Sequence, residues 1–338
     1  MVAAWQADHG YQVGLLRQGS SAFAVQAALD VPTRAHGIWV ERSGTLLSVA
    51  RRPGDWLLRW RADGTAVQWG WIEPDRAFNG HVVASLDGKQ LYTTETDLET
   101  GAGLIGVRDA ATLEKTAEWS THGMDPHELL LDSDGTMVVA NGGIPTLPET
   151  GRLKIHLDRM DASLVRLDLA TGSLRGQWRL ADKRLSLRHI AWGAPQAAGQ
   201  PRKLCIALQA EHTDAVQRTA APLLALFDGK QLQTFAAEHP LAGYGGDVAW
   251  ADGLVAVSCP RANGVALWHG DGRWAGFTPL DEACPLASVT TAQNAKKSGP
   301  AYISAGGRDL ALAFTVAGTT QQTSVASLRL DNHWVALG

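Results

Sequence analysis

Five histidines occupy the same place in a recurring sequence pattern, at the start of a short apolar run that leads into a polar turn. They are His36, His81, His127, His189 and His333. Imidazole nitrogen is a good ligand for iron, copper, nickel and zinc. Two or three such side chains that meet about 2.0–2.2 Å from one point would form a metal site, and the others would support it. The fold must therefore bring residues together that lie far apart in the chain.

The first three of these histidines each begin a predicted β-hairpin. Residues 36–50 read HGIWVERSGTLLSVA, residues 81–95 read HVVASLDGKQLYTTE, and residues 127–141 read HELLLDSDGTMVVAN. A Ser-Gly or Asp-Gly pair between two short apolar runs favours a tight turn, because glycine adopts positive φ at little cost. Looser copies of the pattern begin at residues 189, 247 and 288.

The spacing of these hairpins predicts the fold. Successive copies start 41 to 62 residues apart, and each hairpin is followed by a further apolar strand and a polar turn. A period near 40–50 residues with about four strands per repeat is typical of a β-propeller. The N-terminus supplies three strands and the C-terminal LDNHWVALG supplies a fourth. We therefore predict an all-β fold, a single seven-bladed β-propeller over residues 1–338, closed by N- and C-terminal strands in one blade. The insertion 144–160 is expected to pack over a rim.

In such a propeller the first strand of each blade would begin at one mouth of the central channel, and the second strand would return to it. Polar residues at these strand ends are therefore expected to line the mouth beside the histidines. They are Arg51, Glu95, Glu128, Asn141, Glu211, Asp247, Arg261 and Arg308. Because side chains alternate along a strand, Glu128 should point to the opposite side from His127.

The residues leave several functions open. The histidine mouth could bind a transition metal, or its imidazoles could merely satisfy buried backbone groups beside a wet channel. It could also serve a metal-assisted hydrolase or an oxidoreductase, with Glu95 or Glu211 as general base, or a metal-free interaction scaffold. The sequence contains no G-x-S-x-G, Walker A, H-E-x-x-H or EF-hand motif. We assign no catalytic residue and favour binding over catalysis.

Composition excludes some partners. The net charge of −4 and the pI near 6.3 give no electrostatic reason to expect nucleic acid or an anionic membrane surface. No apolar run approaches the ~20 residues that span a bilayer. The cysteines are Cys205, Cys259 and Cys284, without a CxxC pair. We expect the thiols to be buried and inert, and one disulfide between two of them is the alternative. We also expect a monomer.

Several long segments resemble the DUF1513 family of bacterial proteins. Residues 81–110 and 122–168 carry the resemblance, and LSLRHIAW, SCPRANGVALW and LDNHW extend it over nearly the whole chain. The resemblance implies a seven-bladed propeller exported to the periplasm, often by a twin-arginine signal that this chain lacks. It also implies a link to iron or another metal, with an imelysin-like or other iron-uptake protein as partner. We predict that the mouth binds iron, copper or zinc, or a metal-bearing partner.

Overall fold

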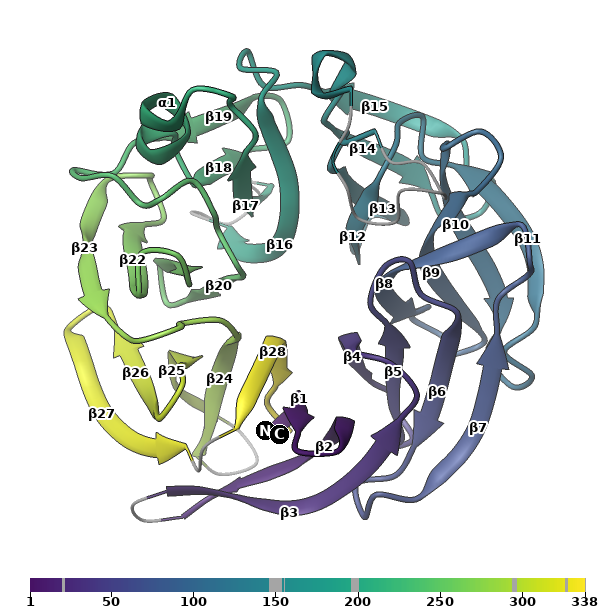
Figure 1. The fold of residues 1–338 in the computed structure, drawn as a ribbon, viewed down its shortest axis with the longest axis horizontal. Helices are drawn as coiled ribbons and strands as arrows, with labels where there is room; N and C mark the ends of the chain where they lie inside the picture. The colour runs from purple at the N-terminus through teal and green to yellow at the C-terminus, as the bar shows by residue number, and fades with distance from the viewer. Residues whose placement is uncertain are drawn as a thin grey trace. The chain divides into compact units, whose positions relative to one another are not determined.

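A computed structural model describes residues 1–19, 22–145, 154, 156–195, 201–293, 297–325 and 328–337. The chain forms two compact units. The middle unit comprises His9–Val13 and Ala27–Arg188, and the terminal unit comprises Met1–Asp8, Gly14–Gln26 and His189–Gly338. Each unit is built from β-sheets whose strands are labelled in Figure 1. Most of the insertion 144–160 lies outside the described residues, so its predicted packing stays a prediction.

The middle unit holds three four-stranded antiparallel sheets in which chain neighbours pair. The first consists of β4 (Ala35–Val40), β5 (Leu46–Ala50), β6 (Trp56–Trp60) and β7 (Ala66–Trp71). The second consists of β8 (Arg76–Ala84), β9 (Gln90–Asp97), β10 (Gly103–Asp109) and β11 (Lys115–Ser120). The third consists of β12 (Pro126–Leu131), β13 (Thr136–Asn141), β14 (Ser163–Asp168) and β15 (Leu174–Trp178). A 3-10 helix spans Leu157–Arg159.

The three predicted hairpin turns of the middle unit are confirmed. Gly44, Gly88 and Gly135 have φ values of 85°, 72° and 80°. Glycine is favoured at each turn because a side chain would be strained in this region of φ. The strands β4 and β12 begin one residue before His36 and His127, as the hairpin pattern predicted, whereas β8 begins at Arg76, five residues before His81.

Two further four-stranded sheets follow along the chain. One consists of β16 (Leu185–Pro195), β17 (Arg202–Ala210), β18 (Leu224–Phe227) and β19 (Leu232–Phe235), with helix α1 (Ala215–Ala220) between β17 and β18. The other consists of β20 (Val248–Ala251), β21 (Leu254–Cys259), β22 (Gly264–His269) and β23 (Trp274–Pro279).

The remaining strands form an eight-stranded closed sheet that includes both ends of the chain. Its strands are β1 (Val2–Ala7), β2 (Gly10–Gln18), β3 (Ala22–Val31), β24 (Leu286–Gln293), β25 (Lys297–Gly306), β26 (Leu310–Thr315), β27 (Gly318–Val325) and β28 (Arg329–Val335). Strand β28 pairs antiparallel with β1, so the C-terminal strand joins the N-terminal ones as predicted. Among the described residues, short parallel pairings link the strands β28, β1, β2 and β3 to the strands β24–β27, at Leu286–His333 and at two positions of β27 and β3.

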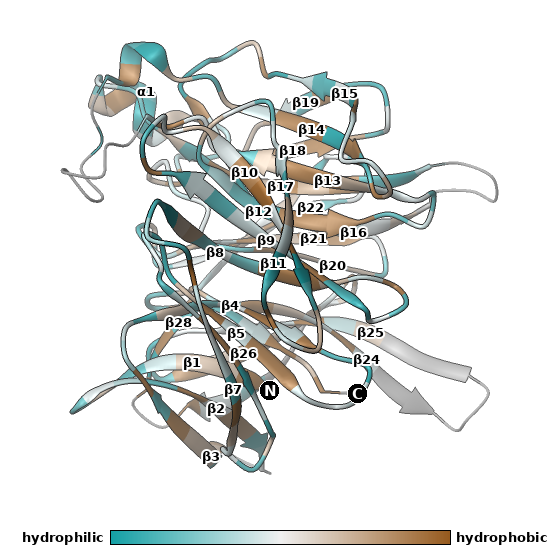
Figure 2. Ribbon diagram, turned by 90° about the vertical axis from the view of Figure 1, so that its right-hand side faces the viewer, coloured by the Kyte–Doolittle hydropathy of each residue, from teal (hydrophilic) through white to brown (hydrophobic). Residues whose placement is uncertain are grey.

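The inner strands of each sheet carry the hydrophobic core. All five residues of β5 are buried, whereas the outermost strand β11 is largely exposed and hydrophilic (Figure 2). Side chains from β8–β10 and from β12–β14 pack into one cluster, with Ile105, Leu129 and Val165 fully buried. Burying each such side chain contributes about 1.5–3 kcal/mol. The sheets of the middle unit are thereby held face to face.

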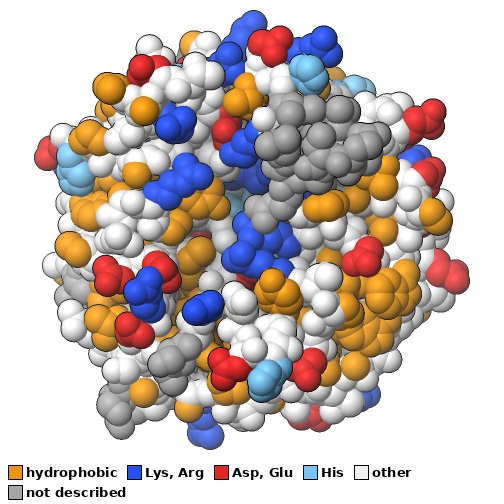
Figure 3. All heavy atoms as spheres, viewed as in Figure 1, with side chains coloured by type: hydrophobic (Ala, Val, Ile, Leu, Met, Phe, Trp, Pro, Cys, Tyr) orange, Lys and Arg blue, Asp and Glu red, His pale blue; other side chains and the backbone are white. Residues whose placement is uncertain are grey.

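The surface and the helices give no sign of membrane insertion by a helix. No helix of the described residues has the length and hydrophobicity needed to cross a bilayer. Acidic and basic side chains are interspersed on the face drawn in Figure 3.

All three cysteines are free thiols, so a disulfide among them is absent from the structure. Cys205 and Cys259 are buried, and burial raises the pKa of Cys259 to about 12 and that of Cys205 further. Because the thiolate is the reactive form, we expect neither to react with an aromatic disulfide reagent in the native protein. Half-buried Cys284 should react first, and all three should react in denaturant. Rapid native labelling of Cys205 or Cys259, located by mass spectrometry, would contradict this prediction.

Candidate metal centre

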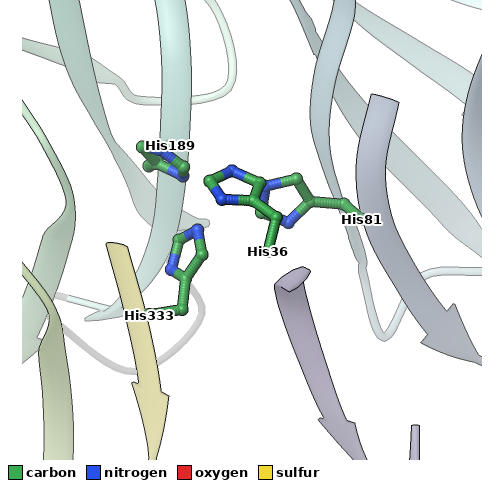
Figure 4. Close-up of side chains that lie close together, drawn as sticks. All are labelled: His36, His81, His189 and His333. Carbon is green, nitrogen blue, oxygen red and sulfur yellow. The ribbon is translucent and has the colours of Figure 1, made fainter. Parts of the chain in front are cut away.

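Three of the predicted histidines meet inside the middle unit. His36, His81 and His127 lie on β4, β8 and β12, and each is at most 5% exposed. The centroid of the His36 ring lies 4.9 Å from that of His81 and 5.5 Å from that of His127, and His81 and His127 are 5.2 Å apart. One ligand nitrogen of His36 lies within 4.8 Å of one of His81 (Figure 4). We call these three residues the middle histidine cluster.

Each of these histidines lies at a β-bulge. The pairing register shifts between Ala35 and Ile38 in β4, between Phe78 and Val82 in β8, and between Pro126 and Glu128 in β12. The extra residues on the inner strand include the histidine in all three cases. A bulge bends its strand and redirects a side chain, and bulges are common beside functional sites. The bulges therefore aim three imidazoles at one place.

Two glycines allow the strands that carry His36 and His81 to approach closely. Gly80 has a φ of 107°, and a Cβ there would lie 2.8 Å from Cδ2 of His36. A Cβ on Gly37 would lie 2.4 Å from the carbonyl oxygen of Gly80. Both positions thus require glycine. Gly80 is required by its backbone conformation and by its close contact, and Gly37 is required by its close contact alone.

We expect Gly80→Ala to reduce the free energy of unfolding by about 1–3 kcal/mol, because it adds backbone strain and displaces the His36 ring. Denaturant titration would measure this loss. Gly88→Ala is the matched control, because Gly88 also has positive φ but nothing lies within 4 Å of its added Cβ. An equal loss in the two variants would show that the contact with His36 contributes nothing.

A carboxylate accompanies the middle histidine cluster. Oε1 of Glu128 lies 3.6 Å from Nδ1 of His81. Carboxylates in this position orient metal-binding imidazoles and make them more basic. The sequence predicts that Glu128 points to the opposite side of β12 from His127. The bulge at His127 breaks the regular alternation of β12, and both His127 and Glu128 approach His81.

The terminal unit holds the other two predicted histidines. The rings of His189 on β16 and His333 on β28 have centroids 4.3 Å apart (Figure 4). We call them the terminal histidine pair. Oδ2 of Asp247 lies 3.2 Å from Nδ1 of His333. His333 also lies in a bulge, because residues 331–333 face a single residue of β1.

The carboxylate of Asp247 is held in place by the backbone. Its Oδ1 accepts a hydrogen bond of 2.8 Å from the N–H of Val248, and its Oδ2 accepts one of 2.9 Å from the N–H of Leu286. Asp247 is only 3% exposed. The terminal unit therefore has a second imidazole–carboxylate arrangement of the kind that supports metal ligands.

Glu95 belongs to a buried network of ion pairs. It is fully buried, with Oε1 2.7 Å from Nη2 of Arg108 and Oε2 2.7 Å from Nζ of Lys115. The hydroxyl of Thr93 also donates to Oε1. Because Thr93 and Glu95 share one side of β9, the alternation of the strand turns Glu95 toward Arg108 on β10. These contacts hold Glu95 within its own sheet, and its place at a mouth stays a prediction.

The other predicted mouth residues have separate surroundings. Arg308 is exposed and paired with Glu282, and Arg261 is exposed with its guanidinium 4.8 Å from the centroid of the Tyr244 ring. Glu211 is buried and accepts a hydrogen bond of 2.6 Å from Gln209. Their place at a mouth stays a prediction.

Asn141 and Arg51 flank the strands of the middle unit. Nδ2 of Asn141 donates to the carbonyl oxygen of Thr121 at 2.9 Å and to the hydroxyl of Ser163 at 3.2 Å. Asn141 thus fastens the end of β13. Arg51 is half-buried, and its N–H donates to the carbonyl oxygen of Arg34.

Sequence reasoning missed one charged group near the middle histidine cluster. The buried carboxylate of Asp125 pairs with Arg52 through Oδ1 and with Arg188 through Oδ2, the latter at 2.9 Å. Asp125 precedes His127 by two residues. No local pattern joins residues 52, 125 and 188, so only the folded structure reveals this contact.

Solved structures similar to this chain share its fold at low sequence identity. "Kuenenia stuttgartiensis Hydrazine Synthase" has a TM-score of 0.60 and 12% identity, covering 95% of this chain and 91% of that chain. "Crystal Structure of Mitotic Checkpoint Complex" has 0.60 and 12%, covering 95% and 87%. "Streptogramin B lyase structure" has 0.57 and 14%, covering 86% and 83%. These propeller-like neighbours support an all-β fold of four-stranded sheets and carry no function to this chain.

Comparison by sequence assigns the family. No curated protein matches the chain significantly. The family described as "Protein of unknown function (DUF1513)" matches residues 29–337, nearly the whole chain, as the resemblance of its long segments indicated. The chain therefore belongs to the DUF1513 family.

Proposed function

We propose that this protein binds a transition-metal ion, iron, copper or zinc, through the middle histidine cluster. The observation that carries the proposal is the meeting of three buried imidazoles from three separate sheets, at centroid distances of 4.9 to 5.5 Å. Neutral imidazole suits these ions, and in a bound complex each ligand nitrogen would lie about 2.0–2.1 Å from the ion.

Electrostatics are compatible with this role. Two protonated imidazoles at such a separation would repel each other strongly in a buried site. Neutral imidazoles avoid that repulsion and are the form that binds a metal ion, and Glu128 beside His81 would offset part of the charge of the ion. The terminal histidine pair with Asp247 offers a second donor set of the same chemistry.

The wider role follows from the family and the repeat pattern. We propose a periplasmic, single-domain, monomeric binding protein linked to metal acquisition, with an imelysin-like or other iron-uptake protein as its partner. Dividing the eight-stranded sheet into the β28–β1–β2–β3 and β24–β27 groups supports seven blades. That all five histidines line one mouth rests on the repeat alone and stays a prediction.

Metal analysis of the protein purified without a histidine tag tests the proposal. After dialysis against each metal and removal of the excess, we expect at least one bound ion per chain, and calorimetry should give a dissociation constant well below millimolar. The absence of binding tighter than ~1 mM for iron, copper and zinc (about −4 kcal/mol) would contradict it.

The structure gives less support to the alternatives. A metal-assisted hydrolase, lactonase-like, or an oxidoreductase could use the same histidines, but the predicted base Glu95 has its carboxylate held by Arg108 and Lys115. Glu211 remains as a candidate base for that reaction class. Turnover of lactones or phosphotriesters with added metal would favour the enzyme. Partner capture insensitive to a chelator would favour the metal-free scaffold.

A further inference from the structure

An ion pair joins the first and third sheets of the middle unit. Arg52 follows β5 of the first sheet, and its guanidinium contacts Oδ1 of Asp125, which precedes β12 of the third sheet. Oδ2 of Asp125 lies 2.9 Å from Nη1 of Arg188. The side chain of Asp125 is only 2% exposed and that of Arg52 is 15% exposed. Because a buried carboxylate is stable only when it is paired, these contacts fix the place of Asp125.

The two ends of this ion pair lead directly to two members of the middle histidine cluster. Asp125 is two residues before His127, which is at most about 7 Å along an extended chain. Arg52 is two residues after the end of β5, whose last residue pairs with the residue before His36. The ion pair therefore joins the same two sheets whose histidine rings have centroids 5.5 Å apart.

The backbone that leads to His127 has an uncommon conformation. Asp125 has a φ of 53°, in the left-handed region that few residues with a side chain adopt. The N–H of Gly142 donates to the carbonyl oxygen of Asp125 at 2.7 Å, and the N–H of Gly143 donates to that of Met124 at 3.1 Å. Such a conformation persists only where its surroundings hold it. The direction in which the chain enters the bulge at His127 thus depends on the contacts of Asp125.

The loop that contains Arg52 also contacts the second sheet. Gly54 forms an isolated bridge with Phe78, in which the two N–H groups donate at 2.9 and 2.8 Å. Phe78 is three residues before His81 and lies in the same strand. One loop of the first sheet therefore contacts the segment that precedes each of the other two histidines of the cluster.

We propose that Arg52 is a positioning residue for the middle histidine cluster. Its ion pair with Asp125 holds the bulge of His127 in place, so that the three imidazoles are arranged in advance to bind one metal ion. This inference rests on the proposed function and names a residue that shapes its site. Without the ion pair, the left-handed backbone at Asp125 loses part of its support, and the ring of His127 moves relative to that of His36.

Charge alone predicts the opposite effect on metal binding. A guanidinium repels a bound cation, so removal of its charge would strengthen metal binding if Arg52 had no positioning role. Loss of a positioning contact weakens binding instead. We expect Arg52→Gln to bind zinc about tenfold more weakly in calorimetry, at the lower end of the loss that follows removal of a residue that orients metal ligands.

Arg59→Gln is the matched control. The side chain of Arg59 is 12% exposed, pairs with Glu41 and donates to the carbonyl oxygen of Ala110 at 2.6 Å, so it too joins two sheets. Its partner Glu41 follows the end of β4, whereas His36 lies at the start of that strand. Arg59→Gln should lower the midpoint of urea unfolding and still bind zinc as tightly as the unaltered protein.

NMR signals of the histidine rings provide a readout that needs no metal. They are recorded on chelator-treated protein and assigned by replacing each histidine in turn. The signals of His36 and His127 should shift in Arg52→Gln and stay in place in Arg59→Gln. Arg52→Lys keeps the charge and can still pair with Asp125, so it should return both the signals and the zinc affinity toward those of the unaltered protein. A residue that only stabilised the fold would not give this pattern.

The outcomes separate the two proposals. Shifted ring signals in Arg52→Gln, together with no zinc binding by the unaltered protein, would uphold the positioning role and overturn the proposed function. Zinc binding by the unaltered protein, with equal or tighter binding and unshifted signals in folded Arg52→Gln, would overturn the positioning role alone. An equal loss of zinc affinity in Arg59→Gln would also overturn it, because the loss would then follow from stability. If thermal melting shows that Arg52→Gln is unfolded, Arg52→Lys serves the same comparison, with a smaller loss of affinity and smaller shifts.

Discussion

The double variant His81→Ala/His127→Ala is expected to lose metal binding to the middle histidine cluster. Removal of an outer partner of a metal ligand costs about 10–100-fold in affinity, and removal of two ligands should exceed that range. These two imidazoles contact each other and His36, so the variant leaves a single imidazole of the cluster. Competition with a chromophoric chelator would measure the change.

The control for this variant is His122→Asn. His122 is exposed and has a φ of 52°, which asparagine tolerates. It should bind metal normally. Any binding that survives the double variant should disappear when His189→Ala/His333→Ala is added, because those residues form the terminal histidine pair. Unchanged affinity in a folded variant that lacks all four imidazoles would remove the proposed function.

Glu95→Gln is expected to lower the free energy of unfolding by about 3–5 kcal/mol, because breaking a buried ion pair leaves an uncompensated charge. Arg108 and Lys115 would both lose their fully buried partner and keep contacts only to more exposed carboxylates, and the Arg108 side chain is only 2% exposed. Chemical denaturation would measure the loss.

Glu73→Gln provides the comparison for Glu95→Gln. Glu73 contacts the same Arg108 and Lys115, but its side chain is 39% exposed, and exposed ion pairs contribute about 0–1 kcal/mol. One result would contradict the structural role of Glu95: the Glu95→Gln variant keeps normal stability but lacks a turnover that the unaltered protein shows. It would also restore Glu95 as the general base of an enzyme.

Local sequence patterns were sufficient to predict the strands and turns of the hairpins. The turns at Gly44, Gly88 and Gly135 follow from residue types that adopt positive φ. The strands that follow the turns at Gly44 and Gly135 are mainly apolar because they are buried in the sheet, whereas β9 also buries Thr93, Thr94 and Glu95. The pairing of β28 with β1 followed from an incomplete set of strands at each end of the chain.

The arrangement of the site depended on contacts that no local pattern encodes. The repeat brought His36, His81 and His127 to equivalent places, but an extra residue in a bulge leaves no mark in the apolar pattern. The ion pairs of Glu95 were not predicted, because its partners come from β10 and the start of β11. The Asp125 contacts join positions separated by 63 and 73 residues, and such pairings are set by the packing of whole sheets.

The bulges have a consequence for how this protein could change its ligand. An extra residue outside the regular pairing can be exchanged without shifting the alignment of the two strands. Cysteine at position 36, 81 or 127 should favour softer ions, and aspartate should favour harder ones, while the surrounding sheets keep their order. The scaffold is therefore suited to divergence in metal preference, both among natural relatives and in the laboratory, by single replacements at three known places.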